Sequence, residues 1–254
     1  MPNDDAELVK AGIQGAVEGA MKPFSDLIQA LFGEAATEAG LMFKDSVEHY
    51  RYRRRIRLFQ RTREVLATAG IEPTQVPLKL LLPIIENASN EKEDNLQDIW
   101  ANLLANAATQ DATNKVYPSF PAILKELTAR DVKFLDALFE AASALAKATH
   151  RKMRIEEVTF IPKTLTAIYS QAGLARHTTD GSITAGEWEL EDVQADAREM
   201  RFSLDTFERH GVLEKVYQAI ERDRRDGPEI GIARSFTSLG ACFVAACRDP
   251  RDAR

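Results

Sequence analysis

Arginines dominate the stretch of this chain whose chemistry is easiest to name. Residues 51–63, RYRRRIRLFQRTR, hold seven arginines and no acidic residue. Guanidinium groups bind phosphates through paired N–H donors, and several acting together make binding strongly salt dependent. The same charges can attract an anionic membrane surface. The candidate partner-binding or phosphate-binding residues are Arg51, Arg53, Arg54, Arg55, Arg57 and Arg61.

A helix is expected to position these arginines. On a helical wheel Tyr52, Ile56, Phe59 and Leu66 share one side, and most of the arginines spread over the rest. Two interpretations of the charged surface stay open: it binds an anionic partner, or it pairs with acids of the chain itself. Candidate acids for internal pairing are Glu86, Glu91, Glu93, Asp94 and Asp98.

Residues 77–107, PLKLLLPIIENASNEKEDNLQDIWANLLANA, place two apolar helical patterns around a polar break. The second pattern predicts a buried stripe at helical spacing, made of Leu96, Ile99, Trp100, Leu103, Leu104 and Ala107. Asn95, Asn102 and Asn106 fall opposite this stripe. Because asparagine is an indifferent helix former, its repetition on one face suggests a hydrogen-bonded contact with a partner or a neighbouring helix. Plain solvent exposure is the favoured interpretation.

Composition limits the remaining possibilities. With 254 residues the chain can bury a core without disulfides or metals, and its net charge of −6 confines any basic site to a local patch. Cys242 and Cys247 match neither a zinc pair nor a redox motif, so we expect reduced, partly buried thiols. The acidic start MPNDDAELVK is unlike a signal peptide, and no run reaches the ~18 apolar residues of a spanning helix. We therefore expect a cytoplasmic protein.

The sequence contains no recognisable catalytic motif. Its histidines are dispersed, and neither a zinc-protease motif, a phosphate-binding glycine loop nor a nucleophile elbow occurs. We predict a non-enzymatic protein that needs no metal, no cofactor and no small-molecule substrate.

Periodicity and turn signals predict a mainly α fold in two domains. Residues 1–116 form a helical domain, with a flexible helix over 5–22 and one long or once-broken helix over 24–68. Residues 117–254 form a winged-helix-like α+β unit with one small β-hairpin.

The second domain has its own order of elements. It is expected to open with a helix capped by Thr128, followed by helices over 162–173 and 192–210 and a loop over 178–188 between them. Extended runs over 212–220 and 229–236 form the hairpin, and the motif Thr237-x-x-Gly240-x-x-Phe243 leads into a last helix.

The third helix of the second domain is the element that reads DNA in many such folds. From Arg198 to His210 this helix has equal numbers of arginines and acids, namely Arg198, Arg201 and Arg209 against Glu199, Asp205 and Glu208. DNA readers usually show a basic face there, so the sequence favours a protein-binding or structural role.

Several short motifs occur in a fixed order, among them Gly40-Leu-Met-Phe-Lys-Asp, Val76-Pro-Leu-Lys79, Glu86-Asn-Ala-Ser-Asn-Glu91 and Trp100-Ala-Asn-Leu-Leu-Ala-Asn106. In this order they resemble the abortive-infection alpha family of bacterial proteins, over residues 30–250. The resemblance implies a mostly helical cytoplasmic protein of antiphage defence, without an established biochemical activity. It makes Trp100, Asn102 and Asn106 residues of a family motif.

Two classes of function stay open. A non-enzymatic defence protein would bind a phage or host protein, or a second copy of itself as a homo-oligomer. Peripheral membrane contact through residues 5–66 is a variant of that class. A nucleic-acid-binding regulator would instead use the helix over 51–63, together with the winged-helix unit.

Overall fold

Two compact units make up the chain. The computed structural model describes residues 25–32, 49–109, 116–149, 153–175, 187–220 and 229–251. The first unit runs to Lys125, the second from Glu126 to Val244, and the chain returns to the first unit from Ala245. The sequence places the boundary near residue 117, which would leave the short helix before Lys125 in the second unit.

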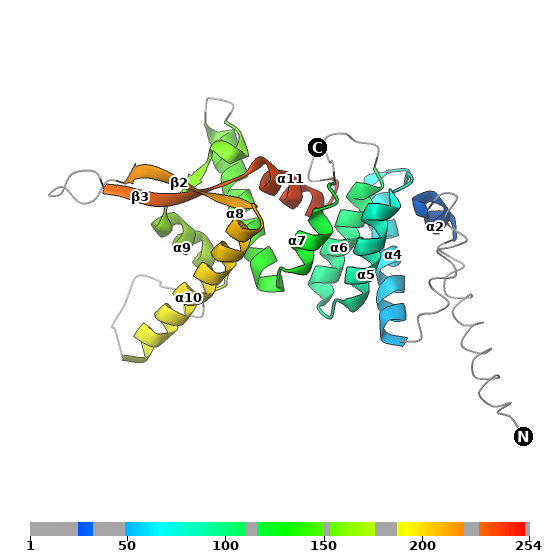
Figure 1. Ribbon diagram of the computed structural model, residues 1–254, viewed down its shortest axis with the longest axis horizontal. Coiled ribbons are helices and arrows are strands. Elements are labelled where there is room, and N and C mark those ends of the chain that lie inside the picture. Colours follow the sequence, from blue (N-terminus) through cyan, green and yellow to red (C-terminus); the bar gives the residue numbers. More distant parts are fainter. Residues whose placement is uncertain are drawn as a thin grey trace, which may run out of the picture. The chain divides into compact units, whose positions relative to one another are not determined.

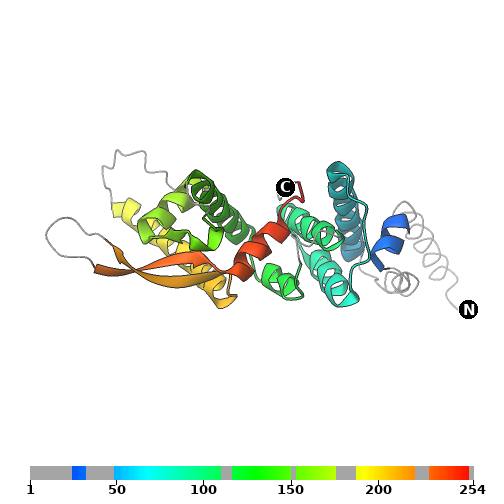
Figure 2. The same cartoon turned by 90° about the horizontal axis from the view of Figure 1, so that it is seen from above.

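The first unit contains helices and no strand in its described part. Its elements are α2 (Ser25–Phe32), α4 (His49–Ala69), α5 (Leu78–Asn90), α6 (Asp94–Ala107) and α7 (Phe120–Lys125). Helices α4, α5 and α6 pack side by side (Figures 1 and 2). The expected helix over 5–22 lies outside the described residues, and of the one over 24–68 only α2 and α4 are described.

Backbone hydrogen bonds hold the linker between α4 and α5. Gly70 has φ +65°, which suits glycine, and it ends α4 while the Ile71 N–H donates to the Leu66 carbonyl. The Val76 N–H donates to the carbonyl of Leu31 in α2 at 3.0 Å. Helix α5 begins at Leu78, so Pro77 precedes the helix instead of occupying its first turn.

The second unit combines helices with a small sheet. Its elements are α8 (Ala129–Ala148), the 3-10 turn η4 (Ile155–Glu157), β1 (Thr159–Phe160), α9 (Pro162–Gln171), α10 (Glu187–Arg209), β2 (Leu213–Ile220), β3 (Glu229–Phe236) and α11 (Ser238–Cys247). The last three residues of α11, from Ala245 to Cys247, belong to the first unit. The predicted order of helices and hairpin is confirmed. Helix α10 begins at Glu187, so the end of the expected loop over 178–188 is helical.

The sheet is antiparallel with the order β1-β3-β2. Strands β2 and β3 form the predicted hairpin, in which Tyr217 lies opposite Ile232. Strand β1 was not predicted, because two residues are too few to show the alternation of a strand. The fold class, mainly α with a small β unit, is confirmed.

Thr128 caps α8 as predicted, and Asp131 completes a capping box. The Thr128 N–H donates to Asp131 Oδ2 at 2.9 Å, and the Asp131 N–H donates to Thr128 Oγ1 at 3.2 Å. The buried carboxylate of Asp131 also accepts a hydrogen bond from Ser203 Oγ in α10. One acidic side chain therefore both starts α8 and ties it to α10.

Close packing explains the glycine of the Thr237-x-x-Gly240-x-x-Phe243 motif. Thr237 Oγ1 accepts a hydrogen bond from the Gly240 N–H at 2.9 Å and so caps α11. A β-carbon at Gly240 would lie 2.0 Å from the Val212 carbonyl oxygen. Phe243 is buried one turn further on. The start of α11 therefore requires a residue without a side chain.

We expect Gly240→Ala to lower the free energy of unfolding by about 3 kcal/mol, because the new methyl group overlaps backbone that cannot yield cheaply. Gly70→Ala is the control, since a β-carbon there meets no atom within 4 Å. It should cost about 1 kcal/mol, for the left-handed backbone alone. Urea denaturation followed by circular dichroism measures both. Equal losses would contradict the close approach at Gly240.

Candidate functional site

The buried face of helix α4 overlaps the predicted apolar side at Phe59 and Leu66 but is rotated from it. Its fully buried residues are Leu58, Phe59, Thr62 and Leu66, whereas Tyr52 and Ile56 are only half-buried. The Thr62 hydroxyl donates to the Leu58 carbonyl within the helix, at 2.8 Å. A threonine satisfied in this way can pack against α6, so the buried face is rotated toward α6 from the predicted apolar side.

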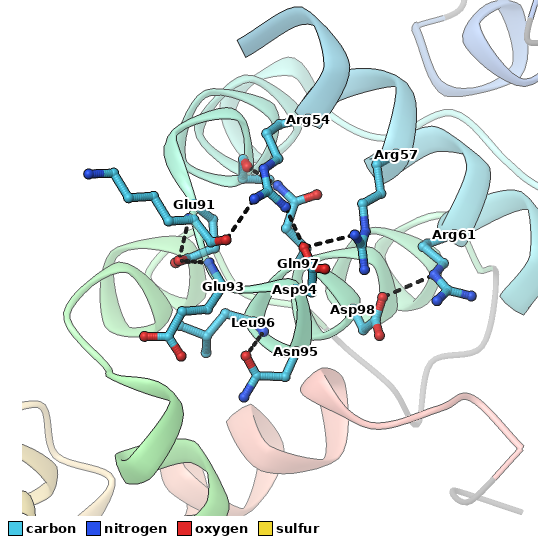
Figure 3. Close-up of polar contacts among 12 residues, drawn as sticks. Arg54, Arg57, Arg61, Glu91, Glu93, Asp94, Asn95, Leu96, Gln97 and Asp98 are labelled. Atoms are coloured by element: carbon cyan, nitrogen blue, oxygen red, sulfur yellow. Dashed lines mark hydrogen bonds and ion pairs between the residues drawn. The ribbon is translucent and has the colours of Figure 1, made fainter. Parts of the chain in front are cut away.

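Three arginines of α4 form ion pairs with acids of α6 (Figure 3). Arg54 Nη1 and Arg57 Nη1 lie 2.6 and 2.8 Å from Asp94 Oδ1. Arg61 Nε lies 3.1 Å from Asp98 Oδ1. Of the two interpretations of the arginine run, internal pairing therefore describes these three residues.

The same contact reaches the backbone of the break between α5 and α6. Arg54 Nη2 donates to the Lys92 carbonyl at 2.6 Å. Glu91 Oε1 accepts from the backbone N–H groups of Lys92 and Glu93, at 2.7 and 3.0 Å. Buried Gln97 donates its amide to the Ala88 carbonyl at the end of α5. Side chains thus provide the hydrogen bonds that backbone groups at the break between α5 and α6 would otherwise lack.

The remaining candidate arginines differ in their surroundings. Arg51 and Arg53 are exposed and Arg55 is half-buried. Burial, and then the charge of Arg51, lower the pKa of Arg55. Arg53 makes no ion pair or hydrogen bond with the described part of the chain. The six candidates therefore do not form one common anion site.

The family-motif helix residues all point into the first unit. Trp100 belongs to the core and Asn106 is only 2% exposed, so the expected solvent exposure of the asparagine face is wrong for Asn106. Asn106 Nδ2 donates to the carbonyls of Ala246 and Arg248 at 2.9 and 2.8 Å. Asn102 Nδ2 donates to the Cys247 carbonyl at 3.2 Å. The asparagines bind the open carbonyls at the end of α11.

The two cysteines of α11 are both free thiols. Cys242 is exposed, and Cys247 sits beside the asparagine contact. Burial raises the pKa of the Cys247 thiol well above its usual range, so this thiol stays protonated and unreactive.

Arg130 connects three helices of the second unit, a role that sequence reasoning missed. Its Nε donates to Tyr169 Oη at 2.8 Å, and its Nη2 lies 2.7 Å from Glu199 Oε2. Burial raises the pKa of Tyr169, and the hydrogen bond from Arg130 opposes that rise. The hydroxyl thus remains neutral and accepts the arginine's hydrogen bonds. Arg130 comes just after the cap Thr128, but no local pattern marks it.

Two of the three acids counted on α10 face inward. Glu199 pairs with Arg130, as above, and Glu208 pairs with Arg234 at 2.8 Å and Lys215 at 2.9 Å. These contacts join α10 to α8 and to both strands of the hairpin. Over residues 198–209 the exposed charges are therefore not balanced, although the numbers of arginines and acids in that stretch are equal.

Large apolar side chains are exposed in the second unit. Phe202 of α10 is 71% exposed, and the cross-strand pair Tyr217 and Ile232 are 69% and 41% exposed. Figure 1 shows α10 and the hairpin leaving their common turn in different directions. Exposed aromatic groups of this size are typical of surfaces that contact a partner.

Residues 52–247 match the sequence model of the family described as abortive infection alpha. The chain belongs to the abortive infection alpha family. The match covers both units, and it ends at Cys247, beside the carbonyls that Asn102 and Asn106 bind. The family name suggests a role in abortive-infection defence. No curated protein and no solved structure is significantly similar to the chain.

Among the described residues, no three His, Cys, Asp or Glu side chains are grouped so that they could hold a metal ion. Within the same residues, no helix combines the length and apolar character needed to cross a membrane.

Acid titration tests the Asp94 ion pairs. Hydrogen bonds from Arg54 and then Arg57 lower the pKa of Asp94. Its contribution to stability is therefore full above the unfolded-state pKa of about 3.9 and is lost as pH falls through the lower folded-state value. Asp94→Asn should be less stable than wild type at pH 7, and the two should converge in strong acid. Thermal unfolding between these pH values, repeated at high salt, measures the difference in stability between wild type and the variant. A difference that does not change with pH would contradict the ion pairing.

Asn106→Asp tests the contact with α11. The substitution keeps the side-chain shape but replaces the donor with an oxygen that faces carbonyl oxygens. We expect a loss of about 2 to 3 kcal/mol in the free energy of unfolding. The matched control is Asn95→Asp, at an exposed position of the same helix, which should change it by less than about 0.5 kcal/mol. Denaturant titration compares the two, and equal effects would contradict the asparagine contact.

Proposed function

We propose that the protein acts in abortive-infection defence without catalysing a reaction, by binding a macromolecular partner through the second unit. The observation that carries this proposal is the exposure of Phe202, Tyr217 and Ile232 on α10 and the hairpin. The other exposed large apolar side chains among the described residues are far apart in the sequence, namely Leu78, Tyr117, Leu145 and Leu239.

The use of the polar groups supports a binding role. The side chains that chemistry would need are occupied in packing: Arg130 and Tyr169 hold three helices together, and Asp131 caps α8. On α4, Arg54, Arg57 and Arg61 connect helices of the first unit. We therefore assign α4 to the scaffold and the second unit to recognition.

A plaque assay tests this proposal. Cells expressing wild type should lower the plating efficiency of at least one phage in a broad panel relative to empty vector. Phe202→Ser/Tyr217→Ser should restore plating at least about tenfold, the effect of losing roughly 1.4 kcal/mol of binding. Both positions are exposed, so the variant should keep the circular dichroism spectrum and melting temperature of wild type.

Leu78→Ser is the control, because Leu78 is an apolar residue at the start of α5 in the first unit and is 40% exposed. This control should protect as wild type does. Plating on wild type equal to empty vector across the panel would refute the defence role. Full protection by the double variant would refute the assignment of the binding surface.

A further inference from the structure

Over residues 198–209, the outer face of α10 consists of Arg198, Arg201, Phe202, Asp205 and Arg209, all of which are exposed. Residues 198, 201, 202, 205 and 209 follow the helical repeat and so share one side of the helix. The opposite side is buried and includes Ser203, Leu204, Thr206 and Phe207.

The charge of this face follows from the inward position of two acids. Glu199 is paired with Arg130, and Glu208 is shared between Lys215 and Arg234. Asp205 is the acid left on the outer face, against three arginines, so three minus one gives a net charge of +2. The chain as a whole carries −6. The face is thus a local basic patch on an acidic protein.

One of the three arginines has a weak internal contact. Arg209 Nη2 lies 3.9 Å from Glu126 Oε2, and both side chains are more than half exposed. Exposed pairs of this length contribute little and are screened by salt. Arg198 and Arg201 make no ion pair with the described part of the chain. All three guanidiniums can therefore turn to an external anion at low cost.

The distribution of apolar groups distinguishes between classes of partner. A helix that docks into a protein groove carries apolar anchors at successive turns. The outer face of α10 has one, Phe202, surrounded by charged residues. Arginines interleaved with an aromatic ring match the needs of nucleic acid instead, where guanidiniums bind phosphates and guanine edges and an apolar group contacts bases.

The dimensions of the helix favour a duplex of DNA. Positions 198 and 209 are separated by about 16 Å along the helix axis, three turns. The major groove of B-DNA is about 12 Å wide and admits an α-helix. Double-stranded RNA has a deep, narrow major groove that side chains cannot read. The hairpin, with Tyr217 and Ile232 exposed, follows directly after α10 and supplies a second contact surface.

We infer that the outer face of α10 binds the major groove of duplex DNA, with Arg198, Arg201 and Arg209 on phosphates or base edges and Phe202 against bases. This inference rests on the proposed function, because it names the partner of the same unit. It also reverses the expectation from the sequence, which counted Glu199 and Glu208 against the arginines.

Fluorescence anisotropy of a labelled, random-sequence DNA duplex of about two helical turns tests the inference. The full chain should bind it at low salt, with an affinity that falls steeply as salt rises. In Arg198→Gln/Arg201→Gln the affinity should fall at least about tenfold, and the log–log salt slope should decrease by about 1.8, or 0.9 for each lost phosphate contact.

Arg53→Gln/Arg63→Gln is the matched control, since both residues are exposed arginines of α4. It should bind within about twofold of wild type. An equal loss in this control would place the DNA site on α4 and overturn the inference. No binding by wild type at low salt would also overturn it.

The outcome separates this inference from the proposed function. If Phe202→Ser/Tyr217→Ser abolishes defence while wild type fails to bind the duplex, the surface is functional but its partner is a protein. If wild type binds the duplex and Arg198→Gln/Arg201→Gln does not, while wild type plates like empty vector across the phage panel, the DNA site stands and the defence role fails.

Discussion

Helix α6 is buried on almost every side, and the first unit is built around the partners that its polar groups require. A buried helix still has unpaired backbone groups at its ends, and buried polar side chains need hydrogen-bond partners. Asp94 and Asp98 meet the arginines of α4, and Gln97 meets the end of α5. Asn102 and Asn106 meet the end of α11. One helix thereby determines which face each neighbour turns inward.

The second unit uses a few shared polar groups in the same way. Asp131 caps the start of α8 and accepts a hydrogen bond from Ser203. Arg130 connects three helices, and Glu208 joins α10 to both strands of the hairpin. Removing one member would leave its partners buried or half-buried without compensation, which costs more than the pair contributes. Such groups therefore specify one arrangement of helices and hairpin more than they add stability.

Local patterns in the sequence predict the elements well and the faces poorly. The helices, the hairpin and the capping box at Thr128 follow from periodicity and short-range chemistry. The buried face of α4 does not follow fully from such patterns. A helical wheel ranks residues by hydrophobicity, whereas packing against α6 also buries the polar side chain of Thr62. The role of Asn106 also does not follow from local patterns, because the carbonyl groups that accept its hydrogen bonds lie 140 and 142 residues away in the chain. Strand β1 exists only through its pairing with β3.

Local sequence patterns also fail to predict which charged side chains stay exposed, and this affects the inferred function. By sequence, the arginine run on α4 is the stronger anion site, and the stretch of α10 over residues 198–209 is neutral. Arg54 donates hydrogen bonds to Asp94 and to the Lys92 carbonyl, which lie 40 and 38 residues further along the chain. An external phosphate must displace both acceptors to bind Arg54. Arg198 and Arg201 have no such internal acceptors to give up in the described structure. Affinity depends on the difference between bound and free states, so this contrast supports the smaller patch on α10 as the proposed anion site.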